Sequence, residues 1–172
     1  MKQGYVQVYT GDVKGKTTAA VGLAMRAAAA GLRVVLLPVH EVRPHRRARC
    51  VSPVRRPHRG GAVRHGRRVE RPDPEDDAQA ARRGLAAARE AVLGGAFDVV
   101  VLDEANVADS LGYFEPDALV DLALERPETV ELVVTGRGAS GTLMAVADLV
   151  TEMREVKHYY EEGVIARRGI EF

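Results

Sequence analysis

Residues 11–18 form a glycine-rich stretch whose residue types are those that bind phosphate. The stretch reads Gly-Asp-Val-Lys-Gly-Lys-Thr-Thr. Backbone N–H groups and the positive end of a following helix bind phosphate oxygens in such loops, while Lys16 adds a charge and the Thr17 hydroxyl can bind Mg²⁺. The spacing is a variant, because three residues separate Gly11 from Gly15 where four are usual, and Thr10 occupies the place of the usual first glycine.

Two carboxylates, Asp103 and Glu104, directly follow a continuous apolar run at 99–102. A run of this kind predicts a parallel strand buried on both faces. Ligands bind at the carboxyl ends of such strands, so the pair indicates a Walker B site for Mg²⁺ when it is combined with the phosphate loop. The alternative is that Asp103 merely caps a helix.

Arg137 lies in a glycine-flanked turn, residues 136–138, after the apolar run 130–135. An arginine at that edge of a sheet could reach a triphosphate. A plain surface turn explains the residue equally well, and the sequence leaves both open. His158, in the C-terminal tail, likewise either contacts a nucleotide or has a structural role.

The elements that must position these residues alternate along the chain. The loop lies between an alternating apolar strand and an alanine-rich helix that Gly31 ends, and a buried strand follows. Later helices begin at the acidic stretch 73–77 and at Glu115-Pro116, with Pro116 in the first turn. The predicted strands are 5–9, 33–38, 99–102, 130–135 and 148–153. The predicted helices are 16–30, 73–92, 140–147 and one that opens at 115 and is ended by Arg126-Pro127. This order predicts a doubly wound, mainly parallel α/β domain of the P-loop type, with residues 1–172 as a single domain.

Composition excludes several classes of protein. No apolar run approaches the roughly 18–20 residues of a membrane span, and the N-terminus does not resemble a signal peptide, so we expect a cytoplasmic protein without a membrane partner. The single Cys50 cannot form an intramolecular disulfide framework. The net charge of +1 conceals an asymmetry, since residues 40–75 contain 11 Arg and four acidic residues and the remainder carries an acidic excess.

Residues 39–75 show neither helical nor strand periodicity, and we expect them to be irregular. One interpretation is a basic loop that cannot bury enough apolar surface to order itself. A second is a polyanion-binding patch, although without an aromatic residue for base stacking nucleic acid is not an expected partner. A third is a G+C-rich coding region translated out of frame. The histidines of the segment have no metal-ligand spacing.

Five motifs together resemble the P-loop cob(I)alamin adenosyltransferase family. They are residues 10–20 (TGDVKGKTTAA), 101–106 (VLDEAN), 134–139 (VTGRGA), 147–158 (ADLVTEMREVKH) and 169–172 (GIEF). The resemblance covers residues 4–38 and about 76–172, and it accounts for the short loop, which is the family's own form. It implies transfer of the 5′-deoxyadenosyl group of ATP to the cobalt(I) of a corrinoid, with release of triphosphate.

The resemblance also implies roles for individual residues. Lys16 and Glu104 would be catalytic, and Mg²⁺ or Mn²⁺ would be held by Thr17 and Glu104 with Asp103 nearby. ATP and the corrinoid would be bound by the loop, by Asn106 and by Arg137. The loop residues concerned are Gly11, Asp12, Val13, Lys14, Gly15, Lys16, Thr17 and Thr18. The family further suggests a homodimer and a reduced flavoprotein as electron donor.

The sequence departs from the family at two places. Val13 replaces the second loop glycine. If that position required a positive φ or a close approach to phosphate, a β-branched residue would strain the loop or weaken ATP binding. Residues 39–75 lack the family's aromatic Phe-x-Trp-like pair, and the chain has no Trp. Because matches resume on both sides, compensating frameshifts are the most economical explanation on family grounds. The alternative function is therefore a nucleotide-binding homologue with impaired or no transferase activity.

Overall fold

The computed structural model describes residues 2–40, 49–50, 74–167 and 169–170. The strands described there form one six-stranded sheet in the order β3-β2-β4-β5-β1-β6. Five of them are parallel to their neighbours, and β3 pairs antiparallel with β2 at one edge. The strands are β1 (Val6–Thr10), β2 (Val34–Pro38), β3 (Arg49–Cys50), β4 (Val99–Asp103), β5 (Glu131–Thr135) and β6 (Leu149–Glu152).

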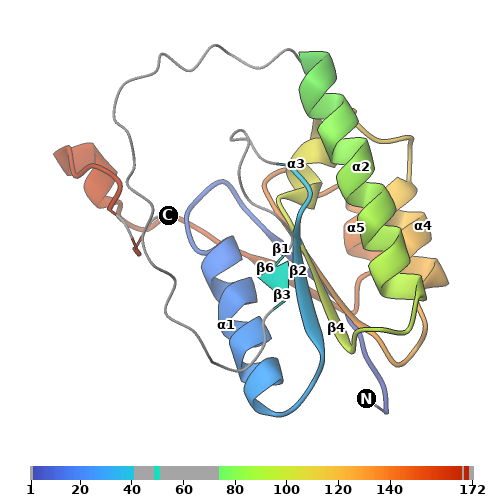
Figure 1. The fold of residues 1–172 in the computed structure, drawn as a ribbon. Coiled ribbons are helices and arrows are strands. Elements are labelled where there is room, and N and C mark those ends of the chain that lie inside the picture. The colour runs from blue at the N-terminus through green and yellow to red at the C-terminus, as the bar shows by residue number, and fades with distance from the viewer. Residues whose placement is uncertain (1, 41–48, 51–73, 168, 171–172) are drawn as a thin grey trace, which may run out of the picture.

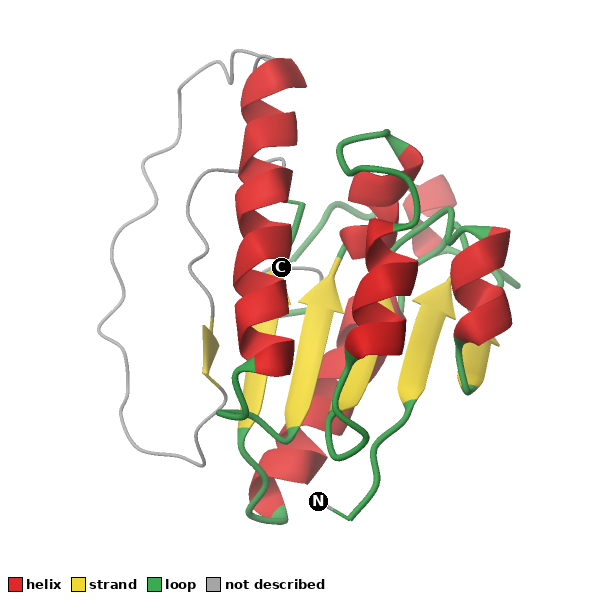
Figure 2. Cartoon of the chain, turned by 90° about the vertical axis from the view of Figure 1, so that its right-hand side faces the viewer, coloured by secondary structure: helices red, strands yellow, loops and turns green. Residues whose placement is uncertain are grey.

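Helices cover both faces of this sheet. Helix α1 lies on one face, while α2, α4 and α5 lie on the other (Figure 1). The helices are α1 (Lys16–Ala29), α2 (Pro74–Leu93), α3 (Ala105–Ser110), α4 (Ala118–Glu125) and α5 (Gly141–Val146), with a 3₁₀ helix, η1 (Tyr159–Glu162), in the C-terminal tail. Figure 2 shows the parallel strands between the two helical layers. The predicted doubly wound, mainly parallel α/β fold is confirmed.

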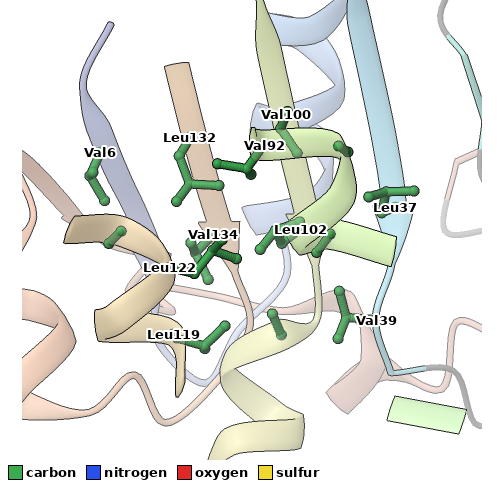
Figure 3. Close-up of a cluster of buried hydrophobic side chains, with 14 of the residues drawn as sticks. Val6, Leu37, Val39, Val92, Val100, Leu102, Leu119, Leu122, Leu132 and Val134 are labelled. Atoms are coloured by element: carbon green, nitrogen blue, oxygen red, sulfur yellow. The ribbon is translucent and has the colours of Figure 1, made fainter. Parts of the chain in front are cut away.

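Alternation along the parallel strands divides the core into two parts. On one face Leu102 and Val134 pack with Leu119 and Leu122 of α4 and Val92 of α2 (Figure 3). On the other face the fully packed residues of α1 are alanines, with Leu23 partly buried beside them. The side chains buried there are Tyr9, Ala20, Ala24, Ala27, Ala28, Val34, Val99, Val101 and Val133. Burial of a Val or Leu side chain contributes about 1.5–3 kcal/mol. Apolar packing on both faces of the sheet therefore fixes the positions of the strands, including their carboxyl ends.

Three details differ from the sequence prediction. A short strand, β3, lies inside the segment that we expected to be irregular; residues 41–48 and 51–73 of that segment lie outside the described residues. Helix α3 was not predicted, because six residues are too few to show a helical period. Pro116 is not in the first turn of a helix, since α4 begins at Ala118 after Asp117, whose φ is +62°. None of the helices in the described ranges has the length and apolar character needed to cross a bilayer.

Candidate functional site

The phosphate loop connects the end of β1 to the start of α1. Gly11 and Gly15 have φ values of +103° and +129°, which favour glycine. A Cβ atom on Gly11 would lie 2.2 Å from the carbonyl oxygen of Met153, just beyond β6. Val13 is not among the residues with a positive φ. Val13 therefore does not strain the loop through a positive φ, whereas its effect on ATP binding through a close approach to phosphate stays a prediction.

Lys16 is folded back into the loop. Its Nζ donates hydrogen bonds to the carbonyl oxygens of Gly11 and Val13, both at 2.6 Å, and the residue is only 5% exposed. Burial lowers the pKa of the Lys16 ammonium, an effect that the negative charge of Glu104 opposes and the positive charge of Arg137 increases. A negatively charged ligand in this loop would favour the charged form of Lys16.

Asp103, at the end of β4, is held by two hydroxyl groups. Its Oδ1 accepts hydrogen bonds from Thr17 Oγ1 at 2.8 Å and from Thr135 Oγ1 at 2.7 Å. Helix α3 instead has Glu104 at its N-cap and no side-chain capping bond there, so the alternative that Asp103 caps this helix is wrong. The structure brings Thr17 and Asp103 together as the sequence predicted. Thr135 was not among the predicted site residues.

Glu104 occupies an unusual backbone conformation beside the loop. Its φ and ψ are 59° and 21°, in the left-handed region that non-glycine residues rarely adopt. Such conformations are found at functional sites more often than elsewhere. Burial, followed by the negative charge of Asp103, raises the pKa of the Glu104 carboxyl, while the positive charges of Lys16 and Arg137 oppose the rise. Glu104 is therefore a carboxylate whose charge a cation would stabilise.

A cavity of about 540 Å³ lies over the loop. One wall consists of the loop with Glu104 and Arg137, and we call it the loop wall. The opposite wall comes from the C-terminal tail, and we call it the tail wall. The loop wall contains Asp12, Val13, Lys14, Gly15, Lys16, Thr17, Thr18, Glu104 and Arg137, and the tail wall contains Glu155, His158, Tyr160, Glu161 and Ile170.

Two residues whose roles the sequence left open lie on these walls. Arg137 is exposed but faces the cavity, so its turn is more than an unrelated surface turn; its contact with triphosphate stays a prediction. His158 also lines the cavity, and its Nδ1 accepts a hydrogen bond from the backbone N–H of Tyr160 at 3.0 Å. Tyr159 OH accepts one from Lys14 Nζ at 2.9 Å, which joins the tail to the loop.

Asn106 lies behind the cavity and not on its surface. The residue is fully buried, and its Nδ2 donates to the carbonyl oxygen of Gly136 at 3.2 Å. Its Oδ1 has no hydrogen-bond partner. Gly136 packs closely on Asn106, because an added Cβ would lie 3.0 Å from the Asn106 Cβ. The structure therefore connects Asn106 to the turn that carries Arg137, whereas the expected contact with ATP or corrinoid stays a prediction.

Among the described residues, the candidate ligand His40 is not one of those that line this cavity. His40 packs against the ring of Tyr113, with centroids 5.6 Å apart. His45, His58 and His65 lie outside the described residues. Within the described ranges, no three His, Cys, Asp or Glu side chains gather where they could hold a metal ion by themselves.

Comparisons with known proteins identify the family of this chain. A family model described as ATP:corrinoid adenosyltransferase BtuR/CobO/CobP matches residues 2–172. The corrinoid adenosyltransferase of Escherichia coli strain K12 is 31% identical over 172 residues, which are 99% of this chain and 87% of that protein. The corrinoid adenosyltransferase of Pseudomonas aeruginosa is 32% identical over 179 residues, 99% of this chain and 85% of that protein.

A third relative, the corrinoid adenosyltransferase CobA of Salmonella typhimurium, is 30% identical over 172 residues, again 99% of this chain and 87% of that protein. These matches extend over nearly the full length of the chain and of each relative. In this chain the matched residues include the phosphate loop, the carboxylate pair at the end of β4 and the residues that line the cavity. The chain belongs to the ATP:corrinoid adenosyltransferase family of enzymes.

Proposed function

We propose that this protein transfers the 5′-deoxyadenosyl group of ATP to the cobalt(I) of a corrinoid and releases triphosphate. The observation that carries the proposal is the cavity in which Lys16, Thr17 and Glu104 of the phosphate loop region face one common space. The family match supports the same reaction and gives no support to a nucleotide-binding homologue without transferase activity.

The chemistry requires positioning from the protein more than a protein nucleophile. The electron pair of cobalt(I) forms the bond to carbon 5′, the bond from carbon 5′ to the phosphate oxygen breaks, and triphosphate leaves with that electron pair. Lys16 and the N–H groups of the loop would stabilise the charge that develops on the leaving group. The loop would also hold ATP so that carbon 5′ is presented in line with the attacking cobalt. Arg137, on the same wall, is placed to add positive charge.

The oxygen ligands at the loop wall fit Mg²⁺. Thr17, Asp103 and Glu104 supply hydroxyl and carboxylate oxygens, which hard divalent cations prefer. Mg²⁺ usually binds through one or two carboxylates together with substrate phosphates, and this fits a site without a complete cage of protein ligands. When bound, the ion would neutralise charge on the triphosphate. Thr17 and Glu104 would hold it, and Asp103 would orient Thr17.

The proposal can be tested with the purified protein, ATP, Mg²⁺ and chemically reduced cobalamin. We expect a light-sensitive alkyl-cobalt spectrum and one triphosphate released for each cobalt alkylated. Lys16→Ala should lower the rate by about 100-fold or more, because it removes a donor from the developing charge. Lys157→Ala is the matched control, since this exposed lysine forms a surface ion pair with Glu162, and such pairs contribute little.

Two results would contradict the proposed function. Release of ADP would identify an ordinary phosphotransferase. Binding of ATP without any alkyl-cobalt product would identify a nucleotide-binding homologue. In that second case, grafting a family-like segment at residues 39–75 should restore transfer if the altered segment is the cause. Steeply salt-dependent binding to nucleic acid, lost on deletion of residues 40–72, would support the polyanion interpretation instead.

The remaining parts of the proposal rest on the family resemblance. We infer that the enzyme is cytoplasmic, that each chain folds as a single domain, and that two chains form a homodimer. Cobalt(I) must be supplied by reduction, and a reduced flavoprotein is the proposed donor. Light scattering of the purified protein would test the dimer, with a monomer at micromolar concentration as the opposing result.

A further inference from the structure

The buried hydroxyl group of Thr135, at the end of β5, bonds to two consecutive residues at the end of β4, Asp103 and Glu104. Thr135 is fully buried, and its Oγ1 makes two different hydrogen bonds. It donates its proton to Asp103 Oδ1 at 2.7 Å and accepts from the backbone N–H of Glu104 at 3.0 Å. A buried polar side chain is expensive unless it is satisfied, so this pair of bonds fixes the orientation of the hydroxyl.

The first bond controls the carboxylate that faces the phosphate loop. Asp103 Oδ1 also accepts from Thr17 Oγ1 at 2.8 Å. The carboxylate is thus held between a hydroxyl from α1 and a hydroxyl from β5. Two fixed donors on one oxygen restrict rotation of the carboxylate, and therefore restrict where Thr17 can point.

The second bond controls the backbone of the next residue. Glu104 has a φ of 59°, and non-glycine residues adopt this conformation only where their surroundings hold them in it. The bond from its N–H to Thr135 is one such restraint, and the Glu104 side chain projects from this backbone into the cavity wall. Removing the acceptor would leave a strained residue whose partly buried N–H group has lost its hydrogen bond to Thr135.

The strand register explains why Thr135 reaches both residues. Strands β4 and β5 are parallel neighbours in which Leu102 lies opposite Val134, so the residues that follow this pair, Asp103 and Thr135, emerge together at the carboxyl edge. On its other side Thr135 lies opposite Tyr9 of β1, two residues before the loop begins. The side chain of Thr135 therefore connects the ends of β4 and β5, and its backbone lies beside the end of β1.

We infer that Thr135 is a positioning residue that sets the geometry of the metal and triphosphate site through Asp103 and Glu104. It touches neither ATP nor corrinoid. The inference rests on the proposed function in that it takes Mg²⁺ with ATP as the ligand of the loop wall. Outer-shell residues of this kind typically contribute 10- to 100-fold to metal affinity. Loss of the hydroxyl should consequently affect the contribution of Mg²⁺ to ATP binding more than ATP binding itself.

The test compares Thr135→Val, which removes the hydroxyl at nearly constant volume, with Thr135→Ser, which retains it. Isothermal titration calorimetry would measure the dissociation constant of ATP with Mg²⁺ and with EDTA, without any corrinoid. For Thr135→Val we expect the gain in affinity due to Mg²⁺ to fall by roughly tenfold, with the EDTA value within about threefold of wild type, since Lys16 and the loop are retained. Thr135→Ser should restore most of the Mg²⁺ effect.

Several outcomes would overturn the inference. An unchanged Mg²⁺ effect in Thr135→Val would do so, as would a loss in Thr135→Ser equal to that in Thr135→Val, which would indicate a packing role for the methyl group. If Thr135→Val and Thr135→Ala both fail to fold while Thr135→Ser folds, the hydroxyl determines the fold and is not a positioning group. If the wild-type protein binds ATP equally well with Mg²⁺ and with EDTA, there is no metal site for Thr135 to position, and the inference is wrong. Binding that behaves as expected in a protein that makes no alkyl-cobalt product would refute the proposed function alone.

Discussion

The two walls of the cavity are built in different ways. On the loop wall Lys16 is 5% exposed, and the carboxylate behind it is fixed by the bonds from Thr17 and Thr135 at 2.8 and 2.7 Å. On the tail wall Tyr160 is 75% exposed and Ile170 is 56% exposed. Buried hydrogen bonds resist rearrangement, whereas exposed contacts compete with water. The difference indicates that phosphate chemistry depends on the loop wall, while the tail wall can change with less consequence.

A substitution on the loop wall should have the largest effect. Glu104→Gln is expected to lower the rate of adenosyl transfer by about 100-fold, because it removes a negative charge from the place where metal and triphosphate meet. Steady-state measurement of alkyl-cobalt formation would show this. Glu90→Gln, on the exposed side of α2, is the control and should leave the rate unchanged. Equal rates in wild type and Glu104→Gln would contradict the claim that the reaction depends on the loop wall more than on the tail wall.

The same variant should change two pH profiles. Because the pKa of Glu104 is raised, its carboxylate is lost on acidification at a higher pH than that of an ordinary glutamate, so wild-type transfer should decline there and Glu104→Gln should not. Burial penalises the charged form in the nucleotide-free protein, so Glu104→Gln should melt at a higher temperature at neutral pH. That gain should vanish as the pH falls through the pKa of Glu104, because the wild-type side chain then becomes neutral.

The junction between the walls should show an intermediate effect, on stability. Gly11→Ala would force a side chain to within 2.2 Å of the Met153 carbonyl oxygen at a φ of +103°. We expect it to lower the free energy of unfolding by about 3 kcal/mol, as measured by urea denaturation. Gly22→Ala is the control within α1, where an added Cβ meets no atom within 4 Å, and it should raise stability by about 0.5–1 kcal/mol. Similar urea midpoints for the two variants would show that loop and tail are not tightly packed together.

The contact of Tyr159, which lies between the tail-wall residues His158 and Tyr160 in the sequence, should show the smallest effect. Tyr159→Phe removes the hydroxyl that accepts from Lys14 at 2.9 Å but keeps the ring that packs against the Lys14 and Arg167 cations. Because an exposed hydrogen bond contributes little net free energy, we expect the dissociation constant of ATP to change by less than about threefold. Calorimetric titration would measure it. A tenfold change would place the tail wall under constraints as strict as those of the loop wall.

Much of the fold could be predicted because its signals are local. Each buried parallel strand is a continuous apolar run, and the loop is recognised from eight consecutive residues. Other features depend on contacts between distant segments. The bond from Thr135 to Asp103 requires β4 and β5 to be neighbours in a known register, and the sequence does not state the strand order. The sequence did contain one signal for this contact, since Asp103 and Thr135 each stand at the end of a continuous apolar run. The full burial of Asn106 follows from packing against Gly136, thirty positions away.

The alanine face of α1 has a consequence for how this protein can evolve. Helix α1 carries Lys16 at its first position and packs on the sheet through Ala20, Ala24, Ala27 and Ala28. A larger side chain on that face would push the helix away from the sheet, and with it the loop, although Ala27 lies roughly 16 Å along the helix from Lys16. Natural variation in α1 is therefore expected to accumulate at the exposed positions, such as Met25 and Arg26. The alanines that face the sheet are expected to stay small, because their size determines where α1 holds the ATP-binding loop.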